Sequence, residues 1–196
     1  MPQPPGPDPR PLTGEPLALD LLNTRWIDGG GPHDLLDSVA GLAVWLDSAP
    51  VRTHLGLPDG VPAADRTTLD RLLYARAALD ALAAPAARRD PAILDGATQL
   101  NEVLSHGRVR RELGPDGLPA SVVETDAPSW GPAWYAAESW LSLVADRPDR
   151  IRPCANEACV LHFYDVSKNG TRRWCSMAGC GNRAKAKRHH ARRSGI

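Results

Sequence analysis

The chain has 196 residues, enough for one domain of about 150 residues and a small additional module. Its 23 basic and 23 acidic side chains cancel, but residues 168–196 hold nine basic side chains and no acidic one. Residues 1–167 are therefore acidic, a division that is typical of a polyanion-binding tail on an acidic body. No apolar stretch of about 18 residues or more occurs, which excludes a membrane-spanning helix and favours a cytoplasmic protein.

The beginning of the chain is rich in proline and glycine. Seven of the first sixteen residues are proline, so we expect residues 1–12 to be disordered. The apolar run Leu17–Leu22 is either a short helix or a strand, because periodicity does not discriminate at this length. Gly29, Gly30 and Gly31 predict a mobile loop, and no Gly-Lys-Ser/Thr follows them to make a phosphate-binding loop.

Four segments then repeat apolar residues at helical spacing. They cover residues 35–46, 69–82, 93–104 and 130–144, with expected ends at Pro50, Pro85, Gly107 and Pro148. Residues 108–112 and 121–125 flank a Gly-Pro-Asp-Gly turn and predict a β-hairpin. The predicted fold class is mainly α: a helical N-terminal domain with one small β-hairpin, residues 13–148, and a small C-terminal four-cysteine zinc-finger module ending in a basic helix, residues 149–196.

All four cysteines form two C-x4-C pairs, Cys154 with Cys159 and Cys175 with Cys180, separated by fifteen residues. Two thiol pairs joined by a loop of about 12–20 residues are the usual layout of a closed structural zinc site. Two disulfides, an iron–sulfur cluster or four unrelated thiols are the alternatives, but there is no secretory signal and disulfides seldom persist in the cytosol. We predict one structural zinc ion per chain.

Three histidines near these cysteines are secondary candidates. A histidine would become a ligand only if one of the four cysteines did not bind the metal; the candidates are His162, His189 and His190. Chelation or Cys175→Ser is expected to unfold the zinc module and to leave the helical body folded.

The string R-x-W-C-S-M-x-x-C-G-N-R that ends at Arg183 resembles the CGNR zinc-finger family of bacterial proteins, over about residues 152–193. The D-x-x-N-T string in residues 15–26 resembles the opening of ABATE domains, which usually precede CGNR fingers. This family is classed as stress-induced transcription regulators. The resemblance implies DNA binding, with the N-terminal domain as a ligand-sensing or dimerisation unit.

The basic terminus is predicted to be helical from about Asn182, because Ser176 can cap a helix and good helix formers follow Gly181. Basic side chains surround this helix and leave no apolar stripe, which suits a duplex groove. The candidate nucleic-acid contacts are Arg172, Arg173, Asn182, Arg183, Lys185, Lys187, Arg188 and Arg192. Three alternatives stay open. The arginines offset the charge of a zinc–thiolate centre, or the basic terminus is a solvated frayed end, or the helix docks an acidic protein partner, which makes the chain a zinc-stabilised protein-interaction module.

Polar residues also interrupt the apolar faces of the body. With Asn23 and Arg25, Arg76 and Asn101 could form a small-molecule effector pocket. The interpretation that we favour pairs Arg76 with Asp20 or Asp80 and uses Asn101 to hold a loop, because an unpaired buried polar group costs on the order of 1–3 kcal/mol. A homodimer would be ordinary for a regulator that reads two half-sites. No catalytic motif occurs, so the chain is not expected to be an enzyme.

Overall fold

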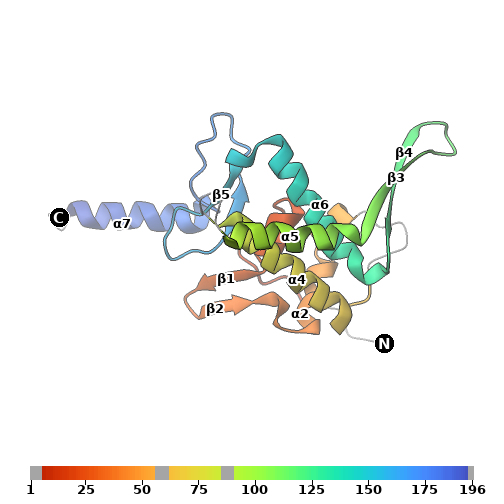
Figure 1. Cartoon of the computed structure of the whole chain (residues 1–196). Coiled ribbons are helices and arrows are strands. Elements are labelled where there is room, and N and C mark those ends of the chain that lie inside the picture. Colours follow the sequence, from red (N-terminus) through yellow and green to blue (C-terminus); the bar gives the residue numbers. More distant parts are fainter. Residues whose placement is uncertain (1–5, 56–61, 85–90, 194–196) are drawn as a thin grey trace.

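A computed structural model gives the structure of residues 6–55, 62–84 and 91–193. Helices dominate it, and each sheet is a two-stranded antiparallel pair (Figure 1). The body contains α1 Leu17–Leu22, β1 Arg25–Asp28, β2 Gly31–Asp34, η1 Leu35–Asp37, α2 Val39–Asp47, α3 Ala49–Leu55, α4 Arg66–Ala83, α5 Pro91–Ser105, β3 Gly107–Leu113, β4 Pro119–Thr125, η2 Pro128–Trp130 and α6 Gly131–Asp146. The C-terminal part contains η3 Pro148–Arg150, β5 Ile151–Pro153, β6 His162–Tyr164, the π-helix η4 Met177–Gly181 and α7 Asn182–Arg193. This mainly α architecture with small hairpins and a C-terminal cysteine cluster confirms the predicted fold class.

The short helix α1 forms the centre of the body. All six of its residues are buried, and it packs against α3, α4 and α6. A helix that is surrounded on every side needs apolar residues all round, which explains why the run showed no periodicity. Its one carboxylate, Asp20, accepts hydrogen bonds from Arg10 Nη1 at 2.5 Å and from Trp45 Nε1 at 3.0 Å. The run Leu17–Leu22 is therefore a helix.

The start of the described chain is anchored through this carboxylate. Arg10 is 6% exposed and forms an ion pair with Asp20. Arg10 lies in the segment predicted to be disordered and is held against α1, because a buried guanidinium must keep its carboxylate partner. Residues 1–5 of that prediction lie outside the described part of the chain.

The glycine-rich stretch that predicted a mobile loop is instead the turn of a β-hairpin. β1 pairs with β2 from Arg25↔Asp34 to Asp28↔Gly31, so two glycines connect the strands. Trp26 and His33 face each other across the strands with ring centroids 4.9 Å apart. Gly31 has φ +109°, which an L side chain rarely adopts. Gly29 and Gly30 do form a connection, but the strands on either side of it were not predicted, because a four-residue strand gives too short an alternation to detect.

The predicted helical segments 69–82 and 93–104 lie within α4 and α5, and the segment 130–144 lies within α6 apart from Trp130, which ends η2. The first segment, 35–46, is divided between η1 and α2, which begins at Val39. Pro50 lies in the first turn of α3, where proline is tolerated, so it does not mark the end of the helical region. β3 and β4 form the predicted hairpin, which projects from the body on the other side from α7 (Figure 1). In the described part of the chain, no helix is long and apolar enough to cross a membrane.

The C-terminal part is joined to the body by buried polar contacts. Asn23 is fully buried; its Nδ2 donates to His162 O at 2.9 Å and its Oδ1 accepts from His162 N at 2.8 Å. Glu15 accepts from Tyr164 N and from Arg172 Nη2. Phe163 is fully buried in the same apolar cluster as α1 and α6. The body and the cysteine-bearing part therefore share one core.

We expect Asn23→Ala to lower the free energy of unfolding by about 2–4 kcal/mol, because it leaves the N–H and C=O of His162 without their partner. Asn101, which is exposed on α5, is the matched control: Asn101→Ala should change the free energy by less than about 0.5 kcal/mol. Urea unfolding of both variants measures the difference. Equal effects of the two substitutions would show that the two hydrogen bonds between Asn23 and His162 contribute no stability.

Candidate metal centre and basic surface

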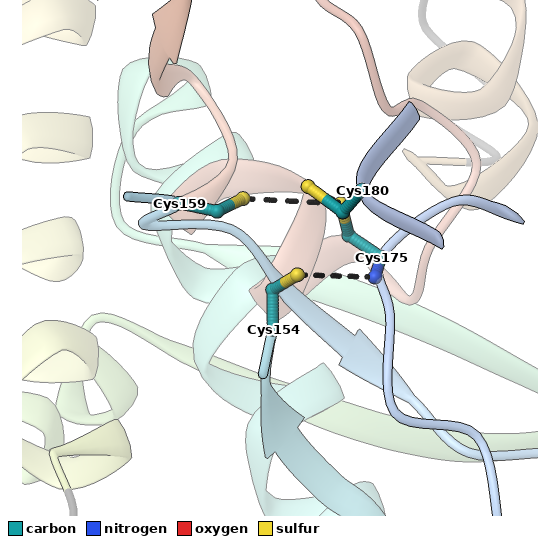
Figure 2. A group of neighbouring side chains, drawn as sticks. All are labelled: Cys154, Cys159, Cys175 and Cys180. Atoms are coloured by element: carbon teal, nitrogen blue, oxygen red, sulfur yellow. Dashed lines mark hydrogen bonds between the residues drawn. The ribbon is translucent and has the colours of Figure 1, made fainter. Parts of the chain in front are cut away.

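The four cysteine side chains converge on one point between the loops that follow β5 and precede α7. Their Sγ atoms all lie within 4.8 Å of one another and point toward each other (Figure 2). Cys159 and Cys175 are 3.8 Å apart, and Cys175 and Cys180 are 3.6 Å apart. Sulfurs bound to one tetrahedral zinc ion at about 2.3 Å are separated by about 3.8 Å. The cluster therefore fits a single zinc ion.

The disulfide alternative does not fit this geometry. A disulfide holds its two sulfurs about 2.05 Å apart, whereas all four cysteines here are free thiols. Three of the four side chains are buried and Cys159 is half-buried. Four sulfurs around one point also leave no open position, which is the arrangement of structural rather than catalytic zinc sites.

Local backbone contacts place the cysteines. Cys154 N donates to Leu161 O at 2.9 Å and Cys159 N donates to Asn156 O at 2.8 Å, which folds the first loop into a tight turn. The second loop ends in η4, where Ser176 Oγ accepts from Gly179 N as an N-cap, as predicted for a cap at this serine. Because η4 contains Cys180 and continues directly into α7, one of the four converging cysteines is attached to the basic helix.

Three donors point at the sulfurs from outside the cluster. Cys154 Sγ accepts from Cys175 N at 3.5 Å, and Cys180 Sγ accepts from Asn156 Nδ2 at 3.4 Å and from Arg183 Nη2 at 3.2 Å. Donors of this kind stabilise thiolates and orient metal ligands. Arg183 thus supports the interpretation that an arginine offsets the charge of the centre, although it is one of the exposed residues.

The thiols influence one another's ionisation. A hydrogen bond from Cys175 is the main cause that lowers the pKa of Cys159 to about 5. The same contact, together with burial, raises the pKa of Cys175, and burial raises the pKa of Cys154. Without a cation, only some of the four thiols can therefore ionise together. A divalent ion removes this conflict, because it binds all four as thiolates.

The guanidinium of Arg172 is occupied by contacts within the protein. Its Nη2 donates to Glu15 Oε1 at 2.8 Å and to Cys175 O at 2.7 Å, and its guanidinium stacks over the Phe163 ring at 4.2 Å. It therefore connects the body to the second cysteine loop. Arginines that face inward cannot be distinguished from surface arginines by charge counting alone.

The remaining predicted nucleic-acid contacts lie around the beginning of α7. Exposed side chains there are Arg173, Asn182, Arg183, Lys185 and Lys187. Arg173, Arg183 and Lys187 line a hollow of about 300 Å³ beside Trp174. α7 contains Arg188, His189 and Arg192, but their side chains lie outside the described part of the structure. His162 is not one of the four converging ligands.

The four residues of the predicted effector pocket are not gathered around one cavity. Arg76 donates through Nη1 and Nη2 to both oxygens of Asp34 at 2.7 Å. We had expected Asp20 or Asp80 as its partner, and that prediction was wrong. The reason is the hairpin that sequence analysis missed, since β2 carries Asp34. Arg25 pairs with Asp80 and lines a cavity, Asn23 holds His162, and Asn101 is exposed on α5.

Two further residues that position the site were not predicted. Asp165, whose side chain is fully buried, accepts from Ser167 N at 2.9 Å and from Arg172 N at 3.0 Å, and so shapes the start of the second loop. Asn156 donates to a sulfur. The Asp-Val-Ser string at residues 165–167 carries a turn signal that could have identified Asp165, whereas Asn156 gives no signal outside its position between two cysteines.

A helical body fused to a closed four-cysteine centre that leads into a basic helix defines a zinc-finger protein. Residues 150–193 match the CGNR zinc finger, and residues 15–147 match the ABATE family, described as "Putative stress-induced transcription regulator". The chain belongs to the ABATE family and carries a CGNR zinc finger after the ABATE domain, which confirms the predicted resemblance and order. No curated protein matched the chain. These findings make it a member of a regulatory, zinc-finger class of proteins.

The shared core changes the expectation for metal removal. Cys154, Cys175 and Cys180 belong to the same apolar cluster as Phe163 and the body helices. We therefore expect chelation or Cys175→Ser to destabilise the body as well as the cysteine loops, because structural zinc contributes about 10–16 kcal/mol of binding free energy to folding. Thermal unfolding followed by circular dichroism, with metal content measured in parallel, tests this expectation.

The untreated chain should contain about one zinc ion and unfold in a single transition that moves to lower temperature after chelation. Adding zinc back after chelation is the control for irreversible damage. Two transitions, with the larger one unaffected by chelation, would instead show that the body folds independently of the metal centre.

Proposed function

We propose that the chain is a zinc-dependent DNA-binding transcription regulator, in which one structural zinc ion fixes a cationic helix that binds duplex DNA. The observation that carries the proposal is the position of α7. It extends away from the helical body (Figure 1) and makes its main packing contacts with η4, the element that carries Cys180. Its sequence has six basic residues and no acidic one.

The dimensions of α7 suit a DNA groove. Twelve residues give a helix about 18 Å long, and the major groove, about 12 Å wide, accepts one α-helix. A helix that is polar on every face gains little from packing on its own protein, so a partner must stabilise it. Phosphates on both walls of a groove can pair with basic side chains that lie around the whole helix.

The exposed residues next to the metal centre extend this surface. Arg173, Arg183 and Lys187 line one hollow together with Glu157, so its three cations outnumber its one carboxylate and are suited to hold a phosphate of the backbone. Lys185 and Asn182 are exposed on the first turns of α7. Arg188 and Arg192 remain candidates from the sequence. Arg172 is left out of the proposed interface, because its donors are used by Glu15 and by backbone carbonyls.

The zinc ion has a structural role in this proposal. Cys154, Cys159, Cys175 and Cys180 would hold it, and bound zinc would supply the positive charge that lets all four sulfurs ionise. Arg183 and Asn156 orient Cys180 through its sulfur. The direction in which α7 leaves the body would then depend on the metal. The acidic body, with a net charge of −9 over residues 1–167, repels DNA and leaves the basic terminus as the contact surface.

Salt dependence tests the DNA contact. If about five of the cations contact phosphates, the logarithm of the binding constant should fall with the logarithm of salt concentration with a slope of about −4 to −5. Lys185→Ala should reduce this slope by about one and weaken binding to all sequences by a similar factor. Fluorescence anisotropy of a labelled duplex measures both quantities. A slope close to zero would contradict the proposal.

Arg172→Ala is the matched control, because it removes the same charge from a side chain that faces inward. It should lower the unfolding temperature through the lost contacts to Glu15 and Cys175. The salt slope of the protein that remains folded should stay unchanged.

Nuclease treatment distinguishes DNA binding from the alternative of an acidic protein partner. A partner that stays bound after digestion would favour the protein-interaction module over DNA binding. A homodimer and a cytoplasmic location remain expectations.

A further inference from the structure

A cavity of about 650 Å³ lies where the body meets the metal centre. The β1–β2 hairpin and the end of α4 form its body side, and the loop from Cys159 to His162 forms the other. Cavities of about 300–1,000 Å³ are typical of small-molecule sites. Neither the zinc ligands nor the proposed DNA contacts account for this cavity.

The lining is mostly apolar and includes side chains that water reaches. Ile27 on β1 is 41% exposed and Val160 in the cysteine loop is 46% exposed, and both border the cavity. Leu22 and Trp26, which are buried, complete the apolar lining. Exposed apolar side chains from two separate elements around one hollow mark a ligand site, because an apolar occupant would remove both from water.

One cation in the lining has donors to spare. Arg25 lines the cavity and pairs with Asp80 through Nη2, and its side chain is 43% exposed. A guanidinium carries five N–H groups in a planar fork, so the Asp80 contact leaves others that can bind a carboxylate. Arg76, by contrast, is held by Thr24 and by both oxygens of Asp34.

The surroundings of Arg25 favour another anion of low charge in addition to the Asp80 carboxylate. Burial, followed by repulsion from Arg76, lowers the pKa of Arg25, and Asp34 only partly compensates. An additional negative charge beside Arg25 is therefore favourable. Asp34 and Asp80 also border the cavity and repel any anion, but they repel a doubly charged phosphate about twice as strongly as a singly charged carboxylate.

We propose that this cavity binds a small apolar monocarboxylate, with its carboxylate on Arg25 and its apolar part between Ile27 and Val160. Of the four residues of the pocket predicted from sequence, this cavity includes Arg25 and not Asn23, Arg76 or Asn101. It does not depend on DNA binding, so the two proposals can fail separately. Because Cys159 and Val160 belong to one wall, an occupant would contact the loop that carries a zinc ligand.

Three compounds of the same shape test the charge requirement: 3-phenylpropanoate, 3-phenylpropanamide and 3-phenylpropylamine. Each is titrated into the zinc-loaded full chain without DNA, and amide chemical shifts of Ile27 and Val160 are followed by NMR. The carboxylate should bind with a Kd of about 0.1–1 mM. The amide should bind at least about tenfold more weakly, and the amine should produce no saturable shift at these residues.

Substitutions then locate the site. Arg25→Gln should remove the preference for the carboxylate over the amide, and Ile27→Glu should abolish carboxylate binding. Ile27→Ser is a second variant without added charge and should weaken binding. Leu94→Glu is the matched control, because Leu94 is 61% exposed on α5 and does not line the cavity. Zinc content and unfolding temperature show that each variant is folded.

The proposal is overturned if the carboxylate shows no saturable binding below about 5 mM, a concentration well above the expected Kd of about 0.1–1 mM. Equal affinity for the carboxylate and the amide would also overturn it, because Arg25 would then play no part. The same holds if folded Ile27→Glu binds as the unaltered chain does, or if Leu94→Glu loses binding to the same extent.

Discussion

Four sulfurs that lie within 4.8 Å of one another can all be ionised only around a cation. This requirement governs the C-terminal part of the chain. The first cysteine loop is a single tight turn and the second ends in a short π-helix, so neither has an extensive apolar core of its own. The ion would join the two loops and, through Cys180, fix the start of α7. The orientation of the most basic segment of the chain would thus be a consequence of metal coordination.

The metal centre is also part of the body. Asn23 binds both backbone polar groups of His162, and Glu15 reaches Tyr164 and Arg172 across more than a hundred residues of sequence. Because unpaired buried groups are costly, these contacts hold the cysteine loops in one position against α1. The cavity beside Arg25 lies at this junction. A molecule bound in this cavity would contact both the body and the loop that contains Cys159. A regulator that links a bound signal to a DNA-binding surface would need a site at such a junction.

The long helices, the β3–β4 hairpin and the cysteine cluster could be predicted because their signals are local: apolar residues at helical spacing, a turn between two strands, and thiols paired at fixed intervals. The β1–β2 hairpin could not, since its strands are too short for a clear alternation. The pairing of Arg76 with Asp34 depends on that hairpin and was missed with it. Arg172 was assigned to nucleic acid because net charge does not reveal which way a side chain faces. The clamp between Asn23 and His162 joins residues far apart in sequence and leaves no local trace.

The central claim is that a zinc ion bound by the four cysteines makes the basic helix competent to bind DNA. The most direct test measures the affinity of one labelled duplex at fixed salt for the zinc-loaded chain, for the chain after chelation, and for the chelated chain after zinc is added back. We predict that binding weakens by at least about a hundredfold on chelation and returns with one equivalent of zinc. Unchanged affinity in the metal-free chain would contradict the account.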